Sequence, residues 1–116
     1  MSVHDEMVVM ADQAVRASRA LARLTSRKKN SILEGMAEEL DQRRAAIKEA
    51  NQKDMEAGRA AGLSQALLDR LLLNDARIDA MIKGIRDIII LKDPVGEKIS
   101  RWTRPNGLEI VKVRVP

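Results

Sequence analysis

Few side chains in this sequence are able to carry out chemistry by themselves. The chain has 116 residues with a single histidine, His4, and no cysteine. Nucleophilic catalysis pairs a nucleophile with a base, and zinc sites draw mainly on imidazole and thiolate ligands. Without a thiol or a second imidazole, the sequence excludes disulfides, thiolate metal sites, zinc chemistry and hydrolytic triads.

Two polar residues interrupt an apolar helical pattern in the middle of the chain. Asn51 and Asp54 are three residues apart, on or beside the face that Ile47, Ala50 and Ala57 share. Polar side chains on such a face need hydrogen-bond partners if they are buried. They could cap or brace a neighbouring segment, or they could serve catalysis. Of these two interpretations we favour the structural one.

The charge pattern limits the class of partner. The chain carries 21 Lys and Arg against 17 Asp and Glu, a net charge of +4, and Trp102 is its only aromatic residue. The basic cluster at 27–29 is therefore better explained by a solvated helical face than by a nucleic-acid site, which usually includes stacking platforms. An acidic start, Asp5 and Glu6, and the lack of a long apolar run predict neither a signal peptide nor a membrane span. We expect a cytoplasmic protein with no nucleic-acid or membrane partner.

Apolar residues recur at three- and four-residue steps and predict five helices. The helices are expected near 3–24, 26–40, 42–58, 65–72 and 75–91. Their predicted capping residues are Ser2 with Asp5, Thr25 or Ser26, Asp41, Ser64, and Asn74 or Asp75. The first helix has an alanine-rich stripe that we expect to be buried. The predicted core includes Leu33, Leu40, Ile82, Ile85 and Ile88.

Beyond Pro94 the sequence predicts a β-hairpin. Residues 98–104 and 108–115 read as strands, and Arg104-Pro105-Asn106-Gly107 as the turn between them. In the second strand valines alternate with Lys112 and Arg114, which we expect to be solvent-side charges that limit pairing at a free edge. The sequence thus predicts a mainly α fold with a hairpin, and the apolar strand at its end predicts a fragment of a longer protein.

A set of motifs in a fixed order resembles a known family. The motifs are Ala-Asn-Gln-Lys-Asp at 50–54, Gly-Leu-Ser at 62–64, Asp69-Arg70-Leu71, the helix from Arg77 to Arg86, Asp93-Pro94-Val95-Gly96, Arg104-Pro105-Asn106-Gly107-Leu108, and Lys112-Val113-Arg114-Val115-Pro116. By these motifs nearly the whole chain is similar to the N-terminal part of the gamma-glutamyl phosphate reductases, or glutamate-5-semialdehyde dehydrogenases, of the aldehyde dehydrogenase superfamily.

The resemblance implies a larger α/β fold and an enzyme of proline biosynthesis. It implies that NADPH reduces L-glutamyl 5-phosphate to glutamate 5-semialdehyde, and that a cysteine thiolate attacks the acyl phosphate. This chain has no cysteine. We therefore expect it to contribute no catalytic, cofactor-binding or metal-binding residue, to bind no cofactor by itself, and to be inactive alone.

The same resemblance implies a structural role for both parts of the chain. Residues 1–93 are expected to pack on the cofactor-binding domain, and residues 94–116 to lead into the rest of the enzyme. The implied partners are that remainder, further copies of the chain in a homo-oligomer, and glutamate 5-kinase as a pathway partner. The alternative is a free-standing helical interaction module with a basic surface.

Overall fold

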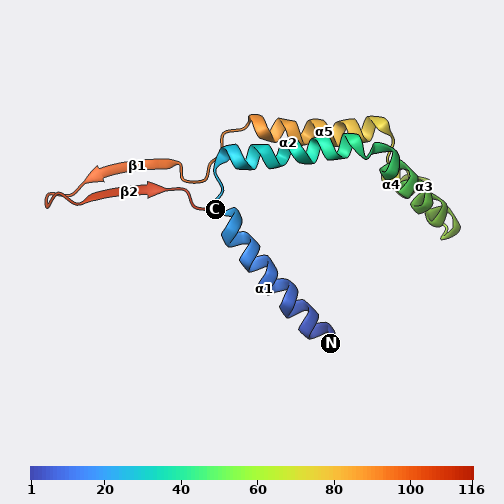
Figure 1. Cartoon of the computed structure of the whole chain (residues 1–116), viewed down its shortest axis with the longest axis horizontal. Coiled ribbons are helices and arrows are strands. Elements are labelled where there is room, and N and C mark those ends of the chain that lie inside the picture. The colour runs from blue at the N-terminus through green and yellow to red at the C-terminus, as the bar shows by residue number, and fades with distance from the viewer. The chain divides into compact units, whose positions relative to one another are not determined.

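The structure, a computed structural model, describes residues 1–116 as five helices followed by a two-stranded antiparallel sheet (Figure 1). The elements are α1 (Val3–Leu21), α2 (Ser26–Gln42), α3 (Arg44–Ala60), α4 (Gln65–Leu71), α5 (Asp75–Ile90), β1 (Lys98–Thr103) and β2 (Glu109–Val113). The predicted mainly α fold with a hairpin is confirmed. No helix has the length and apolar character needed to cross a bilayer.

The chain divides into two compact units. The terminal unit contains Met1–Lys29 and Lys92–Pro116, and the central unit contains Asn30–Leu91. The predicted division at residue 93 concerns packing in a longer protein, and it stays a prediction.

Four helices begin where a side-chain oxygen can accept a backbone N–H three residues later, as the sequence predicts. Ser2 and Asp5 form a reciprocal capping box at the start of α1. Thr25 caps α2 over 3.2 Å, Ser64 caps α4 over 3.3 Å and Asn74 caps α5 over 3.0 Å. Local hydrogen bonding therefore fixes these four boundaries.

The predicted start of α3 is wrong. Asp41 does not cap this helix, because α2 continues through it to Gln42, and the residue before α3 is Arg43, which makes no side-chain cap. The Asp41 carboxylate instead accepts a hydrogen bond from Arg44 over 2.7 Å. An ion pair across the helix junction has replaced the expected cap.

The core of the central unit lies between α2, α3 and α5. Ala37 and Ile78 are fully buried and Ile82 is 7% exposed, while Leu40, Ile47 and Ile85 pack against them. Burial of Ile82 is thus confirmed, whereas Leu33, Leu40 and Ile85 are only half-buried.

Burial of Ile88 is wrong, since its side chain is 53% exposed. Ile78, Ile82 and Ile85 form one stripe on α5, and a rotation of about 100° per residue places Ile88 about 80° to the side of Ile78. Residues on that flank of α5, such as Met81, are exposed as well.

The buried face of α3 differs by one residue from the predicted one. Asn51, Met55 and Gly58 are buried, whereas Ala50, Asp54 and Ala57 are exposed. The cause is α4, which packs closely on Gly58. A Cβ at this glycine would lie 3.0 Å from Leu63 Cδ1 and 3.2 Å from Leu68 Cδ2. A residue without a side chain is needed at this crossing.

The hairpin pairs Trp102 with Ile110 and Thr103 with Glu109, with an irregularity between Lys98 and Ser100. Its turn closes through a hydrogen bond from the Gly107 N–H to the Arg104 carbonyl over 2.9 Å, and Gly107 has φ +83°. Glycine adopts this left-handed conformation without the usual steric cost. The predicted Asn106-Gly107 turn is confirmed.

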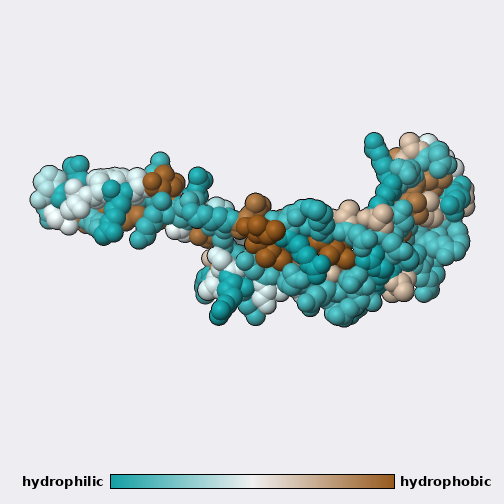
Figure 2. All heavy atoms as spheres, turned by 90° about the horizontal axis from the view of Figure 1, so that it is seen from above, coloured by the Kyte–Doolittle hydropathy of each residue, from teal (hydrophilic) through white to brown (hydrophobic).

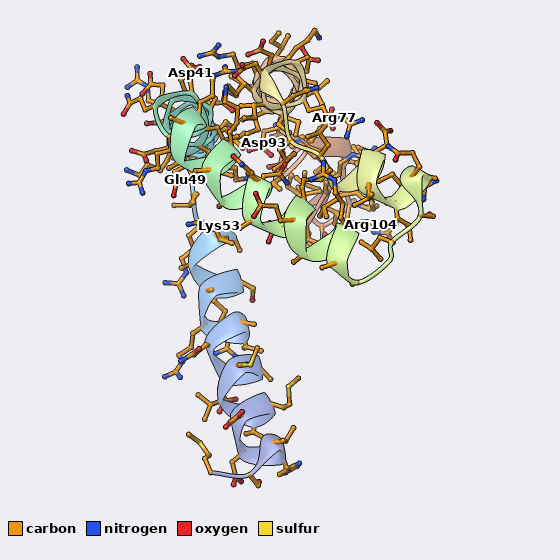
Figure 3. All side chains as sticks on the ribbon, turned by 90° about the vertical axis from the view of Figure 1, so that its right-hand side faces the viewer. Asp41, Glu49, Lys53, Arg77, Asp93 and Arg104 are labelled. Carbon is orange, nitrogen blue, oxygen red and sulfur yellow. The ribbon has the colours of Figure 1, made fainter.

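Helix α1 has no buried residue. Side chains stand out all around its axis (Figure 3). The alanine-rich stripe that the sequence predicts to be buried is therefore exposed.

Candidate functional site

The polar residues singled out by the sequence are not brought together. Asn51 is 5% exposed, and its Nδ2 donates to the Leu71 carbonyl while its Oδ1 accepts the Leu73 N–H, each over 2.8 Å. His4 and Asp54 are exposed and take part in no side-chain hydrogen bond. Asn51 is thus a brace that fixes the segment between α4 and α5, as the structural interpretation predicts.

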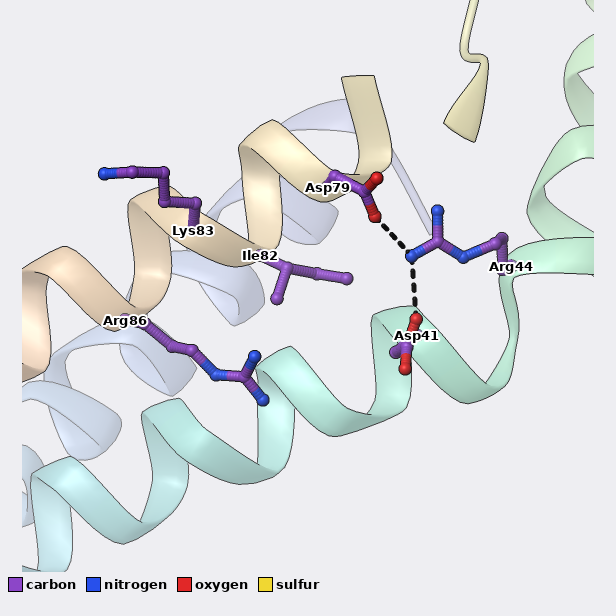
Figure 4. Close-up of a pocket in the computed structure, with 6 residues that line it drawn as sticks. All are labelled: Asp41, Arg44, Asp79, Ile82, Lys83 and Arg86. Atoms are coloured by element: carbon purple, nitrogen blue, oxygen red, sulfur yellow. Dashed lines mark hydrogen bonds and ion pairs between the residues drawn. The ribbon is translucent and has the colours of Figure 1, made fainter. Parts of the chain in front are cut away.

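A charged groove of the central unit lies between the end of α2 and α5. It has a volume of about 410 Å³ and is lined by Asp41, Arg44, Asp79, Ile82, Lys83 and Arg86 (Figure 4). Arg44 Nη2 lies 2.7 Å from Asp41 Oδ1 and 2.6 Å from Asp79 Oδ1. Its Nη1 donates to the carbonyl and the carboxylate of Asp75.

The charged side chains of this groove form ion pairs that hold neighbouring helices together. Hydrogen bonds to Asp41 and Asp79 raise the pKa of the Arg44 guanidinium, and the pKa of Asp75 is lowered by Lys48 and Arg44. Arg86 is paired with Glu34 over 2.9 Å. Carboxylates neutralise both arginines, and Lys83 is paired with Asp87 over 2.6 Å. The groove therefore offers no unpaired cation to an anionic ligand.

A second polar cluster joins the start of α2 to the segment after α5. Asp93 accepts hydrogen bonds from Lys29 Nζ over 2.8 Å, from Ser26 Oγ over 2.9 Å and from the Val95 N–H over 3.0 Å. These contacts, with Lys29 first, lower the pKa of Asp93 to about 2. Sequence reasoning missed this cluster; the Asp-Pro pair at 93–94 signalled only the end of a helix.

None of the carboxyl groups with a shifted pKa fits general acid–base chemistry. These groups are Asp5, Asp75, Asp93 and Glu97, and the pKa of each is lowered. A general acid or base works best with a pKa near the operating pH. No group of three or more His, Cys, Asp or Glu residues is placed to hold a metal ion.

The chain lacks one common type of dinucleotide-binding turn. Nicotinamide dinucleotides commonly bind where a glycine-rich turn connects a strand to the N-terminus of a helix. Here both strands follow all five helices, so no such turn exists. The glycines with positive φ lie elsewhere: Gly62 after α3, Gly96 before β1 and Gly107 in the hairpin turn.

What the chain does present is exposed apolar surface, seen as brown areas between hydrophilic ones in Figure 2. In α1 the exposed apolar side chains include Met7 at 57%, Met10 at 59% and Leu21 at 58%. In the hairpin Trp102 is 45% and Leu108 58% exposed. Apolar surface on this scale commonly marks contact with other protein.

The fold and these surfaces define a mainly helical protein with a β-hairpin whose outstanding feature is exposed apolar surface. No protein-family model matches the chain. Curated relatives do match. This chain is 52% identical over 116 residues to gamma-glutamyl phosphate reductase from Moorella thermoacetica, and the match covers 100% of this chain and 28% of the relative. It is 51% identical over 111 residues to the enzyme of the same name from Halalkalibacterium halodurans, and that match covers 96% of this chain and 27% of the relative.

Solved structures agree with the sequences. The crystal structure of gamma-glutamyl phosphate reductase from Thermotoga maritima matches with a TM-score of 0.91 and 48% identity, covering 96% of this chain and 27% of that one. The Saccharomyces cerevisiae structure of the same name matches with a TM-score of 0.85 and 30% identity, and the match covers 100% of this chain and 29% of that one. The chain is homologous to gamma-glutamyl phosphate reductases, and it spans 27–29% of the length of these relatives.

Proposed function

We propose that this chain is the N-terminal helical segment and β-hairpin of a gamma-glutamyl phosphate reductase. The enzyme is an oxidoreductase of proline biosynthesis that reduces L-glutamyl 5-phosphate to glutamate 5-semialdehyde with release of phosphate. We further propose NADPH as its reductant, membership of the aldehyde dehydrogenase superfamily, and a cytoplasmic location. The observation that carries the proposal is identity of about half over nearly the whole chain to reductases of several organisms.

Within that enzyme the role of this chain is structural. It has no cysteine to serve as a nucleophile, and its fold lacks the strand-to-helix turn at which dinucleotides commonly bind. Its exposed apolar side chains on α1 and the hairpin are suited to pack against the remainder of the enzyme. The free edges of the two-stranded sheet are suited to pair with a second copy, giving a homo-oligomer. Glutamate 5-kinase is the proposed pathway partner.

The competing function, a free-standing interaction module, has no support from the comparisons, since the relatives reported above are all named as reductases.

A chimeric enzyme tests the proposal. The matching 28% of the Moorella thermoacetica enzyme is replaced by this whole chain. Activity is measured in reverse, as reduction of NADP by glutamate 5-semialdehyde in the presence of phosphate, which takes up the acyl group as glutamyl 5-phosphate. We expect the chimera to retain activity, because the chain supplies the same fold. A soluble chimera of native helix content that has no activity contradicts the proposal.

Two controls accompany this assay. The chain by itself is expected to show no turnover, because no residue in it can form a thiohemiacetal with the aldehyde. The chimera with Ile78→Asp is expected to lose activity together with its helix content, since a charge enters a fully buried position. Turnover by the pure chain refutes the structural role.

A further inference from the structure

We infer that Asp93 is a positioning residue that fixes the direction in which the hairpin leaves the first turn of α2. It acts within a group that we term the hairpin clamp: Ser26, Lys29, Asp93, Glu97 and Arg114. This inference goes beyond the proposed function, and it does not depend on it.

The first half of the clamp is centred on Asp93. Its Oδ2 accepts Ser26 Oγ over 2.9 Å and Lys29 Nζ over 2.8 Å, while its Oδ1 accepts the Val95 N–H over 3.0 Å. The carboxylate therefore holds the first turn of α2 with one oxygen and the linker before β1 with the other. Its side chain is 18% exposed, the least of any carboxylate in the ion pairs of this chain.

The second half is centred on Glu97, one residue before β1. Glu97 is paired with Lys92 over 2.8 Å and with Arg114 over 3.2 Å. The Arg114 N–H donates to the Glu97 carbonyl, and the Gly96 N–H donates to the Arg114 carbonyl, each over 2.9 Å. These bonds tie the chain after β2 to the same linker that Asp93 holds.

Packing supplies little alternative restraint at this junction. All residues of β1 are exposed, and no residue of β2 or of the linker is more than half-buried; the half-buried apolar ones are Val95, Ile110 and Val111. A hairpin that contributes so little to an apolar core depends on polar contacts at its base for a defined direction. Loss of Asp93 would leave the Val95 N–H, the Ser26 hydroxyl and the Lys29 ammonium without their shared acceptor.

Spin-label distances measure this direction directly. The absence of cysteine allows two labels to be introduced without background. One label replaces Arg27, exposed in the first turn of α2, and the other replaces Arg104 at the hairpin turn. Electron–electron double resonance on the whole chain is expected to give a single narrow distance peak.

Variants at the clamp are expected to change that peak. Asp93→Ala should abolish the single narrow peak, and Lys29→Met should broaden it. Asp93→Asn should give a peak of intermediate width, between those of the parent and of Asp93→Ala. Its amide oxygen can still accept hydrogen bonds, but the negative charge is lost. Asp54→Ala is the matched control, since Asp54 is exposed and unbonded, and it should leave the peak unchanged.

A second label pair keeps the test independent of folding. Labels at Arg104 and Lys112 lie within the hairpin and report whether it is intact. We expect their distance to stay narrow in Asp93→Ala. A narrow Arg27–Arg104 peak in Asp93→Ala overturns the inference. Broadening of both distances also overturns it, because Asp93 would then stabilise the hairpin itself instead of its direction.

Discussion

Replacement of Asn51 by alanine should destabilise the central unit strongly for so small a change. Asn51 is 5% exposed, and its amide satisfies the Leu71 carbonyl and the Leu73 N–H, each over 2.8 Å. Both backbone groups are half-buried and lose their partner in Asn51→Ala. An unsatisfied buried polar group costs about 1–3 kcal/mol, and partial access of water places each of these two near the lower half of that range. We expect a loss of about 2–4 kcal/mol in the free energy of unfolding.

Urea unfolding at pH 7, followed by far-ultraviolet circular dichroism, measures this loss. The neighbouring variant Gln52→Ala is the matched control. Gln52 is exposed, and its amide bonds only to Glu56 over 3.2 Å, so its loss should stay within about 0.5 kcal/mol. If Asn51→Ala unfolds at the same urea concentration as Gln52→Ala, the brace contributes no stability and the reasoning fails.

Asn51→Asp separates the two hydrogen bonds of the brace. A carboxylate can still accept the Leu73 N–H, but it cannot donate to the Leu71 carbonyl, whose oxygen it would face at close range. Protonation restores a donor, so the pKa of the new carboxyl in the folded state is expected to lie above its unfolded value. The stability of this variant relative to the parent should therefore improve as pH falls from 7 to 4. The absence of such an improvement would show that donation to Leu71 is unimportant.

Three further predictions concern the core, two glycines and the hairpin clamp. Ile78 is fully buried, so Ile78→Ala should lower the free energy of unfolding in urea by about 2–5 kcal/mol. Ile88 is 53% exposed, so Ile88→Ala should lower it by less than about 1 kcal/mol. Equal losses would refute the assignment of the buried stripe of α5. Gly107 has φ +83°, so Gly107→Ala should destabilise the hairpin by about 1 kcal/mol, measured by amide exchange. Gly84 lies inside α5 with nothing within 4 Å of a new Cβ, so Gly84→Ala should stabilise that helix by about 0.5–1 kcal/mol. Effects of the same sign at the two glycines would contradict this reasoning. The pKa of Asp93 is about 2, below its ordinary value of 3.8, so its contribution to stability is present above pH 4 and lost as pH falls through 2; a carbon-13 carboxyl titration with a midpoint near 4 would exclude the bonded geometry.

Features that depend on a few neighbouring residues could be predicted from the sequence. The caps at Ser2, Ser64 and Asn74 and the turn at Gly107 each act over three or four residues, and the structure confirms them. The start of α3 was beyond such reasoning, because the Asp41 side chain bonds to the Arg44 guanidinium instead of a backbone N–H. A nearby guanidinium can compete with the backbone N–H groups for a carboxylate such as that of Asp41. The spacing of residues in the sequence does not decide which of the two partners the carboxylate takes.

Contacts between distant residues could not be predicted. Asn51 bonds to a carbonyl 20 residues away, and Asp93 pairs with a lysine 64 residues away. Asn51 could be flagged as a polar residue in need of a partner, since it interrupts an apolar pattern. Asp93 and Lys29 each resemble ordinary surface charges, and only the fold brings them together.

Helical periodicity identifies the apolar side of a helix, but burial requires a second surface to cover that side. Ile82 and Ile88 both satisfy the period of α5, yet they are 7% and 53% exposed. In α1 the period is equally clear, and Met7 and Leu21 are 57% and 58% exposed. Burying such a side chain stabilises a protein by about 1.5–3 kcal/mol relative to leaving it in water. Apolar residues that keep the period without being buried therefore mark the faces with most to gain from contact with further protein, which in the proposed reductase is the remainder of the enzyme.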